Sequence, residues 1–277
     1  MVNISGSEIG DGEPTYVVAE AGINHNGDIG TAKELIDEAE RFGSDAVKFQ
    51  TYNTEKRVDE TSDVFDVLKK CELREEETRE LFDYADTKNI EVFSTPFDLE
   101  SVNLLEDIGV NVYKIPSFYI THKKLLRRVA ETGKPVIFST GTADRSKVRD
   151  AIEIFEKEGS PYIPLHCVSS YPTQPQDANL EVINTLREIC GDPVGFSDHT
   201  EGIEVPGLSV AVGASVIEKH FTLDSEMEGP DHELSIEPEE FRSMVERIRR
   251  VESILGSGEL EFLESEKDIK PFVKTTE

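Results

Sequence analysis

The sequence is short of cysteine and has no long apolar run. Cys71, Cys167 and Cys190 are the only cysteines in 277 residues. An odd, small number without metal-ligand spacing argues against a disulfide framework. No apolar stretch is long enough to span a membrane, and the N-terminus has neither the basic region nor the apolar run of a signal peptide. These absences predict a cytoplasmic protein.

Positive charge is also scarce. The chain has 57 acidic and 29 basic residues, a formal net charge of −28, and the acidic residues are spread along its whole length. Such a surface repels nucleic acids and anionic lipids, so we expect neither as a partner. It favours a halophile-like protein that works in high salt, where counterions screen the self-repulsion; an ordinary acidic protein is the alternative. An anionic substrate would need a locally positive pocket.

Eight short apolar runs recur at fairly even spacing, and most are rich in Val, Ile and Phe, as strands are. Segments with helical periodicity lie between them, among them 31–42, 78–88, 179–189 and 239–255. Strand alternating with helix eight times predicts an α/β fold, the closed (β/α)8 TIM barrel. An open doubly wound sheet is the alternative, for which six strands would suffice. The predicted strands are 16–22, 45–51, 91–97, 112–117, 135–140, 162–167, 193–198 and 216–222.

Three further segments complete the predicted organisation. Residues 1–15, with three glycines and a proline, are interpreted as a hairpin or plug at one end of a barrel formed by 16–256. Residues 52–73 form a long polar excursion after the second strand, as active-site loops do. The tail 257–277 is polar and is expected to be partly disordered.

Charged residues interrupt the apolar strands near their carboxyl ends, where barrels carry their chemistry. Lys48 and Gln50 share one face of the second strand, and Lys114 interrupts the fourth. A desolvated ammonium group is costly without an anionic partner. Two such lysines on the second and fourth strands of one barrel therefore indicate a pocket for a multiply charged anion. Ion pairing with Glu20 or Glu218 is the structural alternative.

Two histidines follow the same logic. His199 and His220 end the seventh and eighth strands, which are neighbours in a closed barrel. Asp198, Asp231 and Glu20 lie near them in the predicted layout. Two imidazoles on adjacent strand ends favour a divalent-metal site, although a lone histidine is more often a hydrogen-bonded core residue.

Small hydroxyl residues also gather at the predicted strand ends, and turn chemistry alone explains many of them. Together they would supply hydroxyl donors to a phosphate group. Those at the strand ends are Ser94, Thr95, Ser117, Ser139, Thr140, Ser169, Ser170 and Ser197.

Eight segments resemble the motifs of the N-acetylneuraminate (sialic acid) synthase family, whose members include enzymes that make legionaminic and pseudaminic acids. The resemblance runs in order from about residue 17 to 255, with a motif at nearly every strand end. The segments are AEAGINHNG (19–27), AVKFQT (46–51), STPFD (94–98), YKIPS (113–117), GKPVIFSTG (133–141), GFSDHT (195–200), EKHFTLD (218–224) and GPDH (229–232).

The resemblance implies a transferase that condenses phosphoenolpyruvate with an N-acyl hexosamine such as N-acetylmannosamine. The products would be a nine-carbon 2-keto sugar acid and phosphate. It implies a divalent metal, usually Mn²⁺ with Mg²⁺, Co²⁺, Zn²⁺ or Fe²⁺ as alternatives, on His199 and His220, and a homo-oligomer, dimer or tetramer. Residues matching the phosphoenolpyruvate contacts are Lys48, Thr95, Lys114, Ser117, Ser139 and Ser197. Those matching positions near the sugar or reacting atoms are Glu20, Gln50, Ser169, Tyr171 and Asp231.

Three departures from the family pattern bear on the acceptor. Tyr119 stands where the family usually has a glutamate, and a phenol does not replace a carboxylate as a base near neutral pH. Ser169 stands where an asparagine often contacts the sugar. The family's usual C-terminal antifreeze-like domain, which lends an arginine to the partner's sugar site, is not expected in this chain.

Three functions are compatible with these observations. The first is a sialic-acid-type synthase. The second is a related phosphoenolpyruvate-dependent synthase that uses another aldose, such as a phosphorylated one. The third is a catalytically silent homologue that binds a sugar or serves as a partner subunit. The lysines and histidines oppose the third function, because a silent protein has no need for buried charges that cost free energy.

Overall fold

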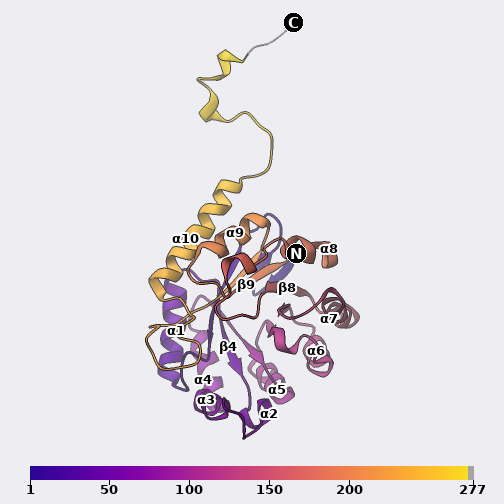
Figure 1. The fold of residues 1–277 in the computed structure, drawn as a ribbon, viewed down its shortest axis with the longest axis vertical. Helices are drawn as coiled ribbons and strands as arrows, with labels where there is room; N and C mark the ends of the chain where they lie inside the picture. The colour runs from indigo at the N-terminus through magenta and orange to yellow at the C-terminus, as the bar shows by residue number, and fades with distance from the viewer. Residues whose placement is uncertain (274–277) are drawn as a thin grey trace.

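The computed structural model describes residues 1–273. Eight parallel strands close into a barrel, because the last strand pairs with both its predecessor and the first (Figure 1). The predicted (β/α)8 barrel is confirmed, and the open sheet is excluded. The barrel strands are β3 (Tyr16–Gly22), β4 (Ala46–Thr51), β5 (Glu91–Pro96), β6 (Tyr113–Ile115), β7 (Val136–Ser139), β8 (Tyr162–Cys167), β9 (Gly195–Asp198) and β10 (Val216–His220).

Helices lie outside the strands and bury one face each. Helix α1 shows why: Asp28 accepts a hydrogen bond from the Thr31 backbone N–H at its start, and its apolar residues recur at helical spacing and are buried against the sheet. The helices are α1 (Ile29–Arg41), α2 (Thr54–Arg57), α3 (Phe65–Cys71), α4 (Glu75–Ala85), α5 (Leu99–Ile108), α6 (Lys123–Ala130), α7 (Arg145–Glu158), α8 (Val182–Cys190), α9 (Glu204–Val212) and α10 (Pro238–Leu255).

A short antiparallel hairpin, β1 (Val2–Ile4) and β2 (Ser7–Ile9), closes the N-terminal end of the barrel. Val2, Ile4 and Ile9 are buried and belong to the same apolar cluster as residues of six barrel strands and Val112, which directly precedes β6. This cluster fills the lower half of the lumen, so the polar side chains occupy only the other, carboxyl-terminal half.

Predicted and observed boundaries differ most in the excursion after β4. The polar segment 52–73 contains two short helices, α2 and α3, where no helix was predicted. Tertiary contacts hold α3 in place: the Tyr52 hydroxyl donates to the Leu68 carbonyl at 2.9 Å. Helix α4 begins earlier than predicted because Glu77 accepts a hydrogen bond from the Arg74 backbone N–H and pairs with the Arg74 guanidinium.

Beyond α10 the chain leaves the barrel as an exposed tail with two single-turn helices, Glu264–Glu266 and Lys270–Phe272 (Figure 1). Of the predicted tail, residues 274–277 lie outside the described range. Within residues 1–273, no helix combines the length and the apolar character needed to cross a membrane.

Candidate functional site

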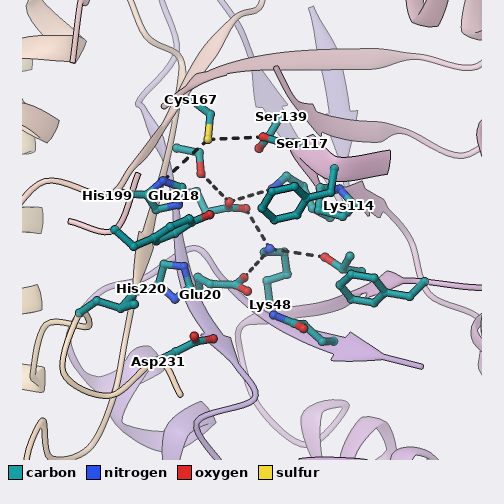
Figure 2. Close-up of a pocket in the computed structure, with 18 of the residues that line it drawn as sticks. Glu20, Lys48, Lys114, Ser117, Ser139, Cys167, His199, Glu218, His220 and Asp231 are labelled. Carbon is teal, nitrogen blue, oxygen red and sulfur yellow. Dashed lines mark hydrogen bonds and ion pairs between the residues drawn. The ribbon is translucent and has the colours of Figure 1, made fainter. Parts of the chain in front are cut away.

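The carboxyl-terminal end of the barrel holds a cavity of about 390 Å³, which we call the strand-end cavity. All of the site residues implied by the family resemblance line it except Ser169, and Figure 2 shows labelled side chains among them converging from different strands. Those lining it are Glu20, Lys48, Gln50, Thr95, Lys114, Ser117, Ser139, Tyr171, Ser197, His199, His220 and Asp231. The strand-end hydroxyls of Ser94, Thr140 and Ser170 are not among the described residues that line it.

Two lysines and two glutamates form a buried ion-pair network on the cavity floor (Figure 2). Lys114 Nζ lies 2.8 Å from Glu218 Oε1, and Lys48 Nζ lies 2.5 Å from Glu20 Oε2 and 3.4 Å from Glu218 Oε2. Ser197 Oγ donates to Glu218 Oε1 at 2.9 Å. The ion pairing considered as the structural alternative is therefore present, and any anion bound here shares the lysines with these carboxylates.

The two glutamates differ in acidity. Burial raises the pKa of the Glu20 carboxyl to about 7, with the nearby Lys48 opposing that rise. Burial acts in the same direction on Glu218, but Lys114 and Lys48 outweigh it and hold the Glu218 pKa far below its ordinary value. Burial lowers the pKa of Lys114, and Glu218 opposes this. Glu20 is therefore the carboxyl in this network that exchanges a proton near neutral pH.

Hydroxyl groups surround the lysines. Lys48 Nζ donates to Thr95 Oγ1 at 3.4 Å, and the Ser117 hydroxyl accepts from the Gly141 backbone N–H at 3.0 Å. The Ser139 hydroxyl is buried, and no hydrogen-bond partner for it exists among residues 1–273. A buried hydroxyl without a partner is costly, which points to a polar ligand beside it.

The two histidines lie at the cavity wall with their ring centroids 5.5 Å apart (Figure 2). The Val168 carbonyl lies 2.8 Å from His199 Nδ1, and because a carbonyl only accepts, the proton belongs on Nδ1 and leaves Nε2 as a ligand atom. Buried His220 Nδ1 lacks a hydrogen-bond partner in the described part of the chain. Burial, and then His199, hold the His220 pKa well below its ordinary value, so this imidazole is neutral.

These features fit a divalent metal with two imidazole ligands. Within residues 1–273, no group of three or more His, Cys, Asp or Glu side chains is placed to hold a metal ion. A cation on His199 and His220 would therefore take its remaining ligands from water or substrate, as in sites that activate a substrate.

Three polar side chains converge over Gly22, at the end of β3. A Cβ atom at this position would lie 3.1 Å from Glu20 Oε1, 3.4 Å from Gln50 Nε2 and 3.7 Å from Asp231 Oδ2. The backbone has φ +54° here, which favours glycine. Burial raises the pKa of Asp231, and Arg57 opposes this. Glycine thus allows a carboxyl, an amide and a second carboxyl to come together over the end of β3.

The loop that carries Asp231 is fixed by hydrogen bonds to the loop after β3. Ser235 Oγ donates to the Asp231 carbonyl at 2.5 Å, and Asn24 Nδ2 donates to Ser235 Oγ at 3.0 Å. Asn26 Nδ2 donates to the Glu228 carbonyl at 2.9 Å. The position of Asp231 therefore depends on the asparagines of the AEAGINHNG segment.

Ser169 does not line the strand-end cavity. A Cβ atom on Gly141 would clash with the hydroxyls of both Ser169 and Ser117, so Ser169 lies against the loop that follows β7, next to a serine that does line the cavity. Tyr119 is also absent from the described residues that line the cavity; it packs against Phe97 and His122 with ring centroids 5.3 Å and 5.6 Å away. The Tyr119 side chain therefore packs among other rings and does not contribute to the described cavity wall.

Several cavity residues were not predicted as site residues. Glu218 shares a strand face with His220, and that spacing was a usable signal. Cys167 lies at the end of β8, with its sulfur 3.5 Å from Ser117 Oγ. Arg57 comes from the end of α2. No sequence pattern marks Arg57, because the placement of α2 depends on tertiary contacts.

A NeuB family model matches residues 35–260, a span that contains the strands bearing Lys48, Lys114, His199 and His220. The chain belongs to the NeuB family. The NeuB match covers most of the barrel and begins after β3, so Glu20 lies outside the matched span.

Similar proteins agree with this NeuB membership. The chain is 42% identical over 278 residues to an N,N'-diacetyllegionaminic acid synthase of Legionella pneumophila, covering 94% of this chain and 78% of the relative. It is 37% identical over 271 residues to a pseudaminic acid synthase of Campylobacter jejuni, covering 92% and 78%. The crystal structure of an N-acetylneuraminic acid synthetase from Leptospira borgpetersenii, in complex with citrate, superposes with a TM-score of 0.94 at 43% identity, covering 98% of this chain and 95% of that one.

Proposed function

We propose that this protein condenses phosphoenolpyruvate with an N-acyl hexosamine aldehyde of the N-acetylmannosamine kind. Carbon 3 of the enol attacks the aldehyde carbon, water adds to carbon 2, and the tetrahedral intermediate expels phosphate. The products are a nine-carbon 2-keto sugar acid and inorganic phosphate. The observation that carries the proposal is the convergence of Lys48, Lys114, His199 and His220 on one cavity in a strongly acidic protein.

The lysines and hydroxyls would bind the anionic groups of phosphoenolpyruvate. Lys48 and Lys114 neutralise its carboxylate and phosphate, and Ser139 donates the hydroxyl that lacks a protein partner. Glu20 lies next to Lys48, and its raised pKa suits a group that takes or gives a proton at the attacking water or at the new hydroxyl.

The histidines would hold a divalent metal, with Mn²⁺ the preferred ion. When bound there, the metal supplies Lewis-acid polarisation of the aldehyde oxygen. Tyr171, whose ring centroid lies 4.2 Å from that of His199, and Asp231 would border the sugar on the side of the cavity mouth.

The test is phosphate release from phosphoenolpyruvate with Mn²⁺ and a panel of aldehyde sugars, in low and in molar salt. The expected result is sugar-dependent release. In the His220→Ala variant, condensation should be lost while phosphoenolpyruvate binding persists. Full activity after chelation would mean that the histidines are structural and that the Lewis-acid role is wrong.

Tyr119 is the observation that favours a second candidate, a silent homologue. Its side chain lies outside the described cavity lining, however, and Glu20 already supplies a carboxyl of suitable pKa. If no sugar in the panel causes phosphate release but one of them binds tightly, the result would favour the silent homologue.

A further inference from the structure

A second, larger cavity of about 640 Å³ opens beside the strand-end cavity; we call it the α3 cavity. Gln50, Arg57, Pro230 and Asp231 line both cavities, so the two adjoin along these four residues. The outer wall of the α3 cavity comes from α3 and the segment before it. A substrate that reacts in the strand-end cavity can therefore extend one substituent into the α3 cavity.

The wall of the α3 cavity is mainly apolar. Val64 and Val67 line it with 49% and 42% of their surface exposed, and Ile23 and Leu68 line it from buried positions. When the apolar surface of a ligand covers exposed apolar side chains in a hollow, the burial of both surfaces stabilises the complex. The wall thus favours an alkyl group over a hydroxylated one.

The charges on the lining cancel. Arg57 and Lys70 carry positive charge, and Glu228 and Asp231 carry negative charge. A phosphate group would need an excess of cations, such as the two lysines of the strand-end cavity. The α3 cavity therefore fits an uncharged substituent, which argues against a phosphorylated acceptor.

Arg57 lies where the two cavities meet and is held rigidly. Its guanidinium carbon lies 3.7 Å from the Phe97 ring centroid and 4.6 Å from that of Tyr52, and Nη1 donates to Gln50 Oε1 at 3.0 Å. Across residues 1–273, Gln50 is the only side chain that accepts a hydrogen bond from this guanidinium, and no carboxylate lies within ion-pair distance. A planar, fixed donor with unused N–H groups suits an amide carbonyl oxygen.

We infer that the α3 cavity is the subsite for the N-acyl substituent of the acceptor sugar. Arg57 donates a hydrogen bond to the acyl carbonyl oxygen, and Val64, Val67 and Leu68 cover the alkyl chain. The inference rests on the proposed function. Since a water molecule occupies about 30 Å³ of liquid, the cavity has room for acyl chains much longer than acetyl.

The test measures binding and turnover along one series of acceptors. N-acetyl-, N-propanoyl-, N-butanoyl- and N-pentanoylmannosamine are compared by phosphate release with phosphoenolpyruvate and Mn²⁺. Their unreactive alditols are compared by titration calorimetry with the protein saturated with phosphoenolpyruvate. Each added methylene should tighten binding about fourfold, the ratio that corresponds to about 0.8 kcal/mol per buried methylene.

Two variants and one control locate the effect. Val67→Asp places a charge on the apolar wall and should abolish the gain with chain length. Leu208→Asp, a matched change of an exposed apolar residue on α9, should keep that gain. Arg57→Met should weaken binding of every alditol by a similar factor and leave the dependence on chain length intact.

The outcomes separate this inference from the proposed function. Affinity that stays flat along the series, or a gain that survives Val67→Asp, overturns the acyl subsite even if sugar-dependent phosphate release is observed. Chain-length-dependent binding that Val67→Asp abolishes supports the subsite, even if no sugar releases phosphate and the proposed reaction fails.

Discussion

Replacing Glu218 with glutamine should affect folding and phosphoenolpyruvate binding in opposite directions. Glu218 pairs with Lys114 at 2.8 Å and with Lys48 at 3.4 Å, and all three side chains are buried. Lys48 keeps Glu20 as a partner in the variant, but Lys114 loses its only carboxylate within ion-pair distance among the described residues. The variant therefore leaves one buried ammonium group unpaired.

The stability loss follows from that unpaired charge. Breaking a buried pair from one side costs about 3 kcal/mol or more. In a chain of this size that corresponds to a fall in melting temperature of roughly 6–12 °C. Glu80→Gln is the matched control, because Glu80 pairs with Lys33 at 2.6 Å but is 55% exposed, and an exposed pair contributes about 1 kcal/mol at most.

The same substitution removes a negative charge that competes with the ligand. A phosphate oxygen on the far side of Lys114 Nζ would lie roughly 6 Å from the Glu218 carboxylate. At an effective dielectric constant of about 20, two unit charges at that distance repel by about 3 kcal/mol. Even if only one third of that repulsion is felt by the bound ligand, its removal corresponds to about a fivefold decrease in Kd. We therefore expect Glu218→Gln to bind phosphoenolpyruvate at least fivefold more tightly.

Differential scanning fluorimetry with and without phosphoenolpyruvate, followed by calorimetric titration, measures both effects. The variant should melt lower without ligand and gain more than the native protein when ligand is added. An unchanged melting temperature combined with weaker phosphoenolpyruvate binding would refute the view that Glu218 and the ligand share the lysines.

Three other predictions follow from the charges. Folding raises the pKa of Glu20 from 4.5 to about 7, so between these pH values the folded state holds a proton that the unfolded chain has lost. The stability of the protein should therefore fall as pH rises from about 4.5 to 7. Thermal melts at a series of pH values measure this, and Glu20→Gln should flatten the dependence. With a net charge of −28, the melting temperature should rise between dilute buffer and molar potassium chloride, and a flat or falling value would contradict the self-repulsion argument. Lys114→Ala should weaken phosphoenolpyruvate binding in calorimetry without loss of Mn²⁺ measured by elemental analysis; loss of both would mean that the variant has disturbed the whole cavity.

The barrel could be predicted from sequence because its strands are buried on both faces and appear as continuous apolar runs. Where strand boundaries differ from the predicted ones, they differ by one or two residues, as at β6, where only Tyr113–Ile115 pairs as a strand. Helix α3 could not be predicted, because its two turns depend on contacts such as that between Tyr52 and Leu68.

The strand-end residues were predictable for a geometric reason: parallel strands bring their carboxyl ends to one edge, whatever the helices do. Sequence did not decide whether Lys48 and Lys114 would pair with glutamates, because that depends on distances of a few ångströms across the lumen. Nor could it place Ser169, whose hydroxyl lies against Gly141, or Arg57, whose position depends on α2.

The hairpin that closes the lower end of the lumen has a kinetic consequence. Reactants and products must use the single opening at the carboxyl-terminal end, since Ile4 and Ile9 are buried in the apolar cluster that fills the other end. Lys114 lies deep in the lumen at 2% exposure, whereas Tyr171 stands at the mouth at 45%. A sugar bound against Tyr171 would obstruct the path to Lys114. Steady-state kinetics should therefore be ordered, with phosphoenolpyruvate entering before the sugar, and a sugar alditol should inhibit uncompetitively with respect to phosphoenolpyruvate.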